Sequence, residues 1–90
     1  MYQLRTTKQF EKDYKLCKKR GLNLDLINEV FALLEVTGNL PTKYKTHKLN
    51  GHYSGFLECH IQSDWLLVWG KDEGKKEVLL TRTGKHSDLF

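Results

Sequence analysis

The segment Phe56–Gly70, FLECHIQSDWLLVWG, decides the fold of this chain. Apolar and polar residues alternate over residues 56–61, which is the period of a β-strand with two different faces. One face carries the apolar side chains of Leu57, Cys59 and Ile61. The other face carries Phe56, Glu58 and His60. Gln62-Ser63 predicts a tight turn, and Asp64–Gly70 then predicts a central strand that is apolar on both faces.

A second run of alternation, Glu77–Thr83, predicts the last strand of the same sheet. Strict alternation places three residues on one face, Val78, Leu80 and Arg82. It places Leu79 and Thr81 on the other. The charged stretch Lys71–Lys76 is expected to form the hairpin loop before this strand. Gly84 turns the chain into a short tail, Lys85–Phe90, and its apolar end, Leu89-Phe90, predicts docking on the sheet.

Helical periodicity replaces the strand period in the N-terminal half. After a short strand over Met1–Arg5, either Thr6 or Thr7 is expected to cap a helix, and Gln9 suits a capping box with Thr6. The apolar stripe of this helix consists of Phe10, Tyr14 and Cys17. A second helix begins at the cap residue Asn23. Its apolar face consists of Leu26, Ile27, Val30, Phe31, Leu33 and Leu34. The link between the helices is very short, so they are expected to form an antiparallel hairpin.

The predicted order of elements, β-α-α-β-β-β, is that of an α+β fold. We expect the helical hairpin to cover one face of a mostly antiparallel sheet and to leave the other face open. Lys43–Leu49 adds a basic, extended segment at the edge, and Asn50-Gly51 marks a turn after it. No internal repeat or linker divides the chain, so residues 1–90 are expected to form one domain.

Composition narrows the classes of partner. Fifteen Lys and Arg residues against eleven Asp and Glu residues give a net charge of +4, which favours nucleic acid or an acidic polypeptide. A helical lysine stripe fits either a solvated face or a phosphate-binding one. It consists of Lys8, Lys12, Lys15 and Lys19. No signal peptide and no membrane span are expected. Cys17 and Cys59 lack metal-site spacing and are expected to be reduced core residues of a cytoplasmic protein.

Five residues suited to phosphate chemistry occur in the strand-rich half: His47, His60, Asp64, Arg82 and His86. Asp64 follows His60 across a tight turn, near enough to hold the imidazole in one tautomer. Arg82 suits a phosphate clamp, and an ion pair with Glu58 or Asp64 explains it equally well. A lone strand histidine more often has only a structural role. Zinc ligation by His60, Asp64 and His86 has no known spacing pattern, so no metal site is expected.

Three stretches carry a resemblance to a known family, and they occur in order along the chain. They are His47–Gly51, then Glu58–Ile61 followed by Asp64–Val68, and Arg82–Phe90. Together they resemble the YafQ branch of the RelE/ParE toxin superfamily, the toxins of bacterial toxin–antitoxin pairs. The resemblance runs end to end and implies a RelE-like fold. Ser63 stands where a proline is common and Leu57 where an arginine is often found, which affects a turn and one phosphate contact.

The resemblance implies an mRNA endoribonuclease that cuts transcripts in the ribosomal A site and halts translation. The active-site positions of the family fall here on His47, His60, Asp64, Trp65, Arg82, His86 and Phe90. In the expected reaction the RNA 2′-hydroxyl attacks the adjacent phosphate. We expect His86 to be the general acid, with the base drawn from His60, Asp64 and His47 and the His60–Asp64 pair as first choice.

The remaining roles concern the phosphate and the bases. Arg82 is expected to stabilise the developing charge, helped by Lys48, and the neighbouring Lys45 is a further substrate-binding residue. Phe90 or Trp65 is expected to stack on a base or to hold the shape of the site. The scheme requires no metal ion and no other cofactor.

The same resemblance implies a cognate antitoxin of the DinJ or RelB type, besides the ribosome and mRNA. The open face and the basic surface predict an acidic, partly disordered antitoxin segment that folds on binding. Operator DNA is expected to be bound only by the toxin–antitoxin complex, and no membrane partner is expected. The alternatives are a basic module that binds without cutting and a ParE-like gyrase inhibitor. The histidines and the aspartate argue against both, because binding alone needs no proton-transfer groups.

Overall fold

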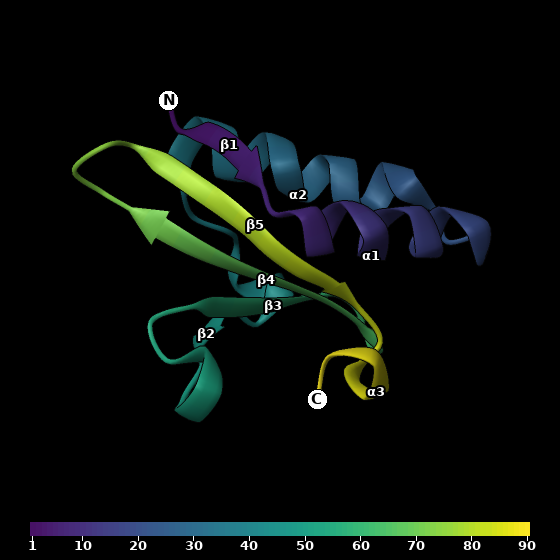
Figure 1. The fold of residues 1–90 in the computed structure, drawn as a ribbon. Helices are drawn as coiled ribbons and strands as arrows, with labels where there is room; N and C mark the ends of the chain where they lie inside the picture. The colour runs from purple at the N-terminus through teal and green to yellow at the C-terminus, as the bar shows by residue number, and fades with distance from the viewer.

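The computed structural model describes residues 1–90 as a five-stranded sheet with two long helices on one side (Figure 1). The strands are β1 (Gln3–Thr6), β2 (His47–Lys48), β3 (Leu57–Gln62), β4 (Trp65–Asp72) and β5 (Glu77–Gly84). The helices are α1 (Lys8–Lys19), α2 (Leu24–Thr37) and α3 (His86–Leu89), and two 3₁₀ turns are η1 (Thr42–Tyr44) and η2 (Gly51–Tyr53). None of the helices has the length and apolar character that crossing a membrane requires. The predicted α+β class is confirmed, and α3 is an element that was not predicted.

The strands lie in the order β1-β5-β4-β3-β2. β1 runs parallel to β5, and the other three pairs are antiparallel, so the sheet is mostly antiparallel as predicted. Residues 56–70 contain the expected hairpin of β3 and β4, in which Cys59 lies opposite Leu67. β2 has two residues, fewer than the extended segment predicted over residues 43–49. The chain first forms η1 there and then turns at Lys45, whose φ of 53° interrupts any strand.

The N-terminal caps explain where the two long helices begin. The Thr7 side chain accepts a hydrogen bond from the Phe10 N–H at 2.9 Å, so Thr7 rather than Thr6 caps α1, and the predicted Thr6 capping box is not formed. Asn23 caps α2 as predicted, by accepting from the Asp25 N–H at 3.0 Å. Both helices pack on the same side of the sheet, as the short link between them requires (Figure 1).

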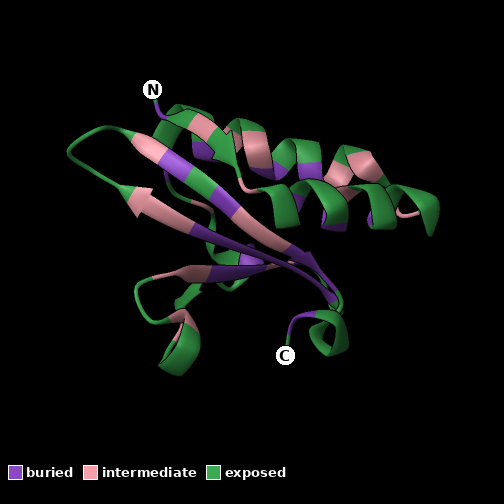
Figure 2. Ribbon diagram, in the orientation of Figure 1, coloured by how far each residue is buried: buried purple, intermediate pink, exposed green.

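Most buried side chains lie between the helices and the sheet, where a cluster of 14 residues forms the main core (Figure 2). The opposite side of the sheet, which we name the second face, has a smaller buried cluster. It consists of Leu66, Val68 and Leu89, with Leu49, Tyr53 and Phe56 packed around it. α3 and η2 lie on this side of the sheet (Figure 1). The face predicted to be open is therefore rimmed by the C-terminal helix and by the loop before β3.

A β-bulge in β5 changes which face Arg82 occupies. Val68 pairs with Arg82 but Trp69 pairs with Leu80, so Thr81 is an extra residue in the strand. Residues paired directly across a sheet point to the same side, and Arg82 therefore shares the second face with Val68. The prediction that Arg82 shares a face with Val78 and Leu80 was wrong, because strict alternation cannot anticipate a bulge.

Candidate active site

The pairing of four strands aligns the candidate residues on the second face. His47 lies opposite Glu58, Glu58 opposite Val68, and Val68 opposite Arg82. These residues form one row across β2, β3, β4 and β5. Neighbouring strands are about 4.8 Å apart, so the backbone at His47 and at Arg82 is separated by about 14 Å. His60 lies two residues further along β3 and on the same face, opposite Leu66.

His47 is held at both ring nitrogens. Its Nδ1 lies 3.2 Å from the carbonyl oxygen of Lys45, and its Nε2 lies 3.2 Å from Glu58 Oε1. A carbonyl oxygen can only accept, so the first contact requires a proton on Nδ1. The second contact brings the other ring nitrogen to a carboxylate, which orients the imidazole. The His60 ring lies beside this pair, with its centroid 6.3 Å from that of His47. His47 and Glu58 thus form an imidazole–carboxylate pair on the second face, with a second imidazole beside it.

Glu58 was not among the predicted site residues. Its side chain is only 7% exposed, and its second oxygen, Oε2, is buried without a hydrogen-bond partner. Burying a carboxylate with incomplete hydrogen bonding is costly, and proteins retain such groups mainly at functional sites. The sequence did contain a signal, because Glu58 is a carboxylate in the middle of an otherwise apolar strand. Its position opposite His47 depends on strand register, which the residues alone do not reveal.

Asp64 was predicted to orient His60, but no hydrogen bond joins the two side chains. Its Oδ1 accepts instead from the backbone N–H of His86 at 3.3 Å. The reason is the hairpin geometry: the last β3–β4 pair is Gln62 with Trp65, and Asp64 lies in the turn beyond it. From there the carboxylate faces the start of α3. Asp64 therefore contacts the residue predicted to be the general acid, rather than the residue predicted to be the base.

The C-terminal tail is docked, as predicted, and it forms the short helix α3. Leu89 is buried on the second face. Asp88 accepts from the Lys85 N–H at 2.9 Å and from Arg20 Nη1 at 2.7 Å. The Arg20 guanidinium and the Lys85 N–H together lower the pKa of Asp88, and the same ion pair raises the pKa of Arg20. These contacts hold His86 at the rim of the second face.

Aromatic rings connect His86 with the loop before β3. The ring centroids of His86 and Phe90 are 5.2 Å apart, and those of Phe90 and Tyr53 are 5.6 Å apart with the planes nearly perpendicular. Phe90 is 53% exposed, so part of its ring is free for stacking on a base. Trp65 differs. It is 2% exposed in the main core and donates to Thr83 Oγ1 at 3.0 Å. A ring this deeply buried cannot stack on a base, so we assign Trp65 the other predicted role, holding the shape of the site.

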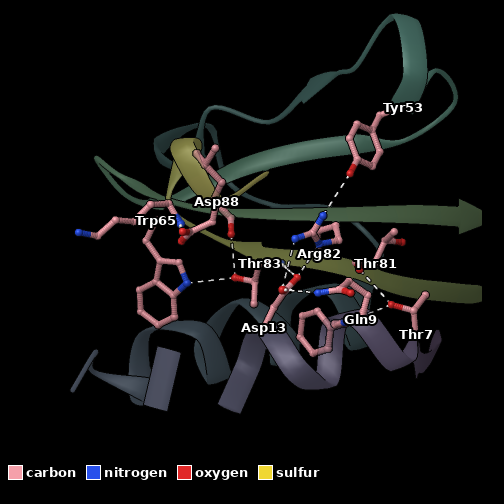
Figure 3. A network of polar contacts seen from close by, with 12 residues as sticks. Thr7, Gln9, Asp13, Tyr53, Trp65, Thr81, Arg82, Thr83 and Asp88 are labelled. Carbon is pink, nitrogen blue, oxygen red and sulfur yellow. Dashed lines mark hydrogen bonds and ion pairs between the residues drawn. The ribbon is translucent and has the colours of Figure 1, made fainter. Parts of the chain in front are cut away.

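Arg82 lies between α1 and the loop before β3, as Figure 3 shows. Its Nε donates to Asp13 Oδ2 at 2.7 Å, and its Nη1 donates to the Tyr53 hydroxyl at 3.4 Å. The hydrogen bonds that Arg82 donates to Asp13 are the main cause that raises the pKa of Arg82, which remains a cation. Neither Glu58 nor Asp64 is its partner. Asp13 was missed, although a carboxylate three residues after Phe10 lies within the apolar stripe of α1 and needs a buried partner.

The lysines predicted to bind substrate are exposed at the β2 edge. Lys48 belongs to β2, and Lys45 precedes it with its carbonyl oxygen on His47. Neither lysine forms an ion pair, so their charges remain free for phosphate groups. No three His, Cys, Asp or Glu side chains lie close enough together to form a metal site. The second face thus carries the His47–Glu58 pair at one end of the row, the Arg82 cation at the other end, and His86 on α3 at the rim.

Comparisons with known proteins point to one family. The model of the family described as bacterial toxin of type II toxin–antitoxin system, YafQ, matches residues 2–90. The mRNA interferase toxin YafQ of Escherichia coli (strain K12) is 35% identical over 83 residues, which are 91% of this chain and 88% of the relative.

Solved structures agree with the sequence comparison. The E. coli DinJ–YafQ toxin–antitoxin complex contains a chain with a TM-score of 0.88 and 32% identity, covering 99% of this chain and 97% of that one. A metal-bound toxin from Helicobacter pylori has a TM-score of 0.90 and 39% identity, covering 100% of both chains. This chain belongs to the YafQ family of bacterial toxins of type II toxin–antitoxin systems.

Proposed function

We propose that this chain is an mRNA interferase whose active site is the second face of the sheet. The observation that carries the proposal is the gathering of acid–base groups and an arginine on the one face that α1 and α2 leave uncovered. The E. coli relative of similar length is an mRNA interferase toxin, which supports the same reaction. RNA cleavage by its own 2′-hydroxyl needs a base, an acid and a cation for the phosphate, and all three are present here.

The contacts favour His47 with Glu58 as the base that takes the 2′-hydroxyl proton. This choice replaces the His60–Asp64 pair, because no hydrogen bond or ion pair joins those two residues, whereas His47 Nε2 lies 3.2 Å from Glu58. His60 lies beside the pair and can accept the proton in its place. Each proton transfer by a positioned side chain contributes about 10²–10⁴ in rate.

His86, on α3 at the rim of the second face, is proposed as the general acid for the leaving 5′-oxygen. Asp64 holds the His86 backbone, and Phe90 packs against the His86 ring. Arg82 neutralises the charge that develops on the phosphate, and the exposed part of Phe90 stacks on a base. Lys45 and Lys48 contact the flanking phosphates. No step is assigned to a metal ion.

The partners are proposed from the same family. The E. coli YafQ is known in complex with the antitoxin DinJ, and we propose that an acidic antitoxin likewise neutralises this chain. The ribosomal A site is the proposed location of cleavage, where the ribosome presents single-stranded mRNA. The other candidate function is binding without cleavage, including gyrase inhibition on the same fold. A non-cutting protein has no need for an exposed histidine paired with the buried carboxylate of Glu58, which favours the nuclease.

The proposal is tested by primer extension on a defined mRNA in purified ribosomes. Wild-type protein is compared with His86→Ala, His47→Ala and the control His52→Gln, an exposed histidine outside the proposed site. We expect discrete cuts from wild type and from the control, and a loss of at least about 10²-fold from the other two. An mRNA with a 2′-deoxy nucleotide at the cut site should survive, because it lacks the attacking hydroxyl.

Other outcomes assign the chain differently. Cuts on free RNA at the same rate would remove the requirement for the ribosome but keep the nuclease. Cleavage of the 2′-deoxy mRNA at the usual rate would contradict attack by the 2′-hydroxyl. Folded protein that cuts in neither setting would favour the binding module, and induced DNA damage in growing cells would favour gyrase as the target.

A further inference from the structure

Asp13 is a nearly buried carboxylate on α1 that receives four hydrogen bonds. Its side chain is 9% exposed. Arg82 donates to it twice, from Nε at 2.7 Å and from Nη2 at 3.4 Å. The backbone N–H of Thr83 donates at 3.2 Å, and the Gln9 side-chain amide donates at 3.0 Å (Figure 3). No part of the proposed reaction uses this residue directly, because it lies on the helix that covers the opposite side of the sheet.

We propose that Asp13 is a positioning residue for RNA cleavage, which holds the Arg82 guanidinium so that its remaining N–H groups face the substrate phosphate. The proposal rests on the proposed function and adds a residue on α1 to it. Asp13 acts through Arg82 and does not touch the RNA.

The number of donors on Arg82 supports this role. A guanidinium has five N–H groups in one plane. Two of them donate to Asp13 and one to the Tyr53 hydroxyl, so two remain, one on each terminal nitrogen. Contacts at Nε and at both terminal nitrogens fix the plane of the group from opposite sides. A fixed guanidinium stabilises transition-state charge without first having to reorganise.

The position of Asp13 follows from where β1 stops. The last β1–β5 pair is Thr6 with Leu80, so the remainder of β5 is a free edge. Side chains of α1 and of its cap residue occupy that edge instead of a strand. The Thr7 hydroxyl donates to the Thr81 carbonyl at 3.0 Å, and Asp13 accepts from the Thr83 N–H. Arg82 lies between these two contacts, at the bulge. The helix thereby reaches a side chain that belongs to the opposite face.

A carboxylate is required at this position for a simple reason. All four groups that point at Asp13 are donors, and a carboxylate only accepts. An asparagine fits the same volume but brings an NH₂ group that must face at least one of these donors. Asp13→Asn therefore removes the charge and disturbs the fork on Arg82 while altering packing very little.

The decisive experiment is a double-mutant cycle measured as single-turnover RNA cleavage. The variants are Asp13→Asn, Arg82→Ala and the double variant, with Glu11→Gln as the control. Glu11 is an exposed acid on the same helix that contacts Thr6 and not Arg82. We expect Asp13→Asn to lose about 10²-fold in rate. It should lose almost nothing further in the Arg82→Ala background, and its affinity for an uncleavable 2′-deoxy RNA should change less than its rate.

Two results would overturn the proposal. One is a wild-type rate from folded Asp13→Asn. The other is a double variant that loses the product of the two single losses, because Asp13 then acts independently of Arg82, as a purely structural residue does. Circular dichroism gives the folded fraction of each variant, so that a stability loss is not mistaken for a loss of rate.

A measurement on wild-type protein covers the case in which Asp13→Asn does not fold. In NMR spectra the Arg82 Nε–H should exchange slowly with solvent, unlike that of the exposed Arg5. Rapid exchange at Arg82 would contradict the contact itself. This readout requires no cleavage, so it separates the two proposals: an inactive protein with a protected Arg82 would contradict the nuclease and leave the contact intact.

Discussion

Cys59 and His60 are neighbours in β3 and lie in opposite surroundings. Cys59 is fully buried in the main core, whereas His60 lies on the second face and is half-buried. A shift of one residue along a strand exchanges the two faces. Burial disfavours the thiolate and raises the pKa of Cys59 to about 12, so this thiol does not take part in chemistry near neutral pH.

The first prediction concerns the reactivity of Cys59. In the native protein at pH 8 we expect iodoacetamide to leave Cys59 unmodified for hours, while protein unfolded in urea is modified quickly. Mass spectrometry of the digested protein gives the extent of modification at each cysteine. Rapid modification of Cys59 in folded protein would contradict this prediction, because it would require β3 to separate frequently from the main core.

The same pKa determines a dependence of stability on pH. The folded-state pKa of Cys59 is raised above the ordinary value of 9.0, so the stabilisation is fully present below pH 9 and is lost as the pH rises from 9 towards 12. Urea unfolding at pH 7 and pH 10.5 should show lower stability at the higher pH. In Cys59→Ala this difference should become smaller, because one titrating group is removed.

At the scale of elements, α3 depends on contacts made by distant parts of the chain. A helix of four residues does not form by itself in water. Arg20, just after α1, pairs with Asp88, and Asp64 in the β3–β4 turn accepts from the His86 N–H. Leu89 is buried on the second face. These contacts explain why the tail is ordered, and they connect the proposed acid His86 to three other elements.

The second prediction is that Arg20→Gln weakens cleavage without unfolding the protein. Loss of the ion pair frees α3, and we expect faster hydrogen exchange at residues 86–90 together with a cleavage rate several-fold lower, because His86 is held less firmly. Ser87→Ala, on the same helix and outside the ion pair, is the control. Unchanged exchange at α3 in Arg20→Gln would contradict the dependence on Arg20.

The stability that the Arg20–Asp88 ion pair contributes depends on pH with the opposite sign to that of the Cys59 thiol. The pKa of Asp88 is lowered below 3.8 in the folded protein, so its contribution is complete above that value and is lost as the pH falls through the folded-state pKa. The ion pair is partly exposed, which weakens its effect. Protection of α3 from exchange should therefore decrease in acid before protection of β4 does.

Local patterns predicted the elements well and predicted their contacts poorly. Alternation over residues 56–61 located β3, the apolar run over residues 64–70 located β4, and Asn23 located the start of α2. Strand patterns and helix caps are local properties. The bulge at Thr81 and the helix α3 were missed, since both depend on distant partners.

The candidate site shows the same division between residue types and contacts. The residue types suited to RNA cleavage could be read directly, including His47, Arg82 and His86. Their partners could not, because Glu58 reaches His47 through strand register and Asp13 reaches Arg82 from another layer of the fold. A carboxylate inside an apolar pattern, in α1 or in β3, was the one local signal that pointed to both partners.

At the scale of the whole molecule, β4 lies between two buried clusters that have different structural roles, the main core and the small cluster on the second face. Leu67 points into the main core of 14 residues, and Leu66 and Val68 point into the three-residue cluster on the second face. The main core joins the helices to the sheet and accounts for most of the buried apolar surface. The small cluster joins α3 to the sheet, so it serves the geometry of the site more than the stability of the fold.

The third prediction compares two buried leucines, Leu67 and Leu89, that are 0% and 6% exposed. Leu67→Ala leaves a cavity in the main core and should cost about 2–5 kcal/mol in the free energy of unfolding. Its folded fraction should cleave RNA near the wild-type rate. Leu89→Ala should cost less, because α3 can detach without opening the main core, and yet it should lower cleavage strongly by releasing His86 and Phe90.

Urea denaturation and single-turnover cleavage, measured on the same preparations, give both quantities. Leu16→Ala, at a leucine of α1 that is 42% exposed, is the matched control and should change neither of them much. Equal losses of stability and activity in the two buried variants would mean that both clusters unfold together. The second face would then be an integral part of the fold, and α3 would have no independent freedom to detach from the site.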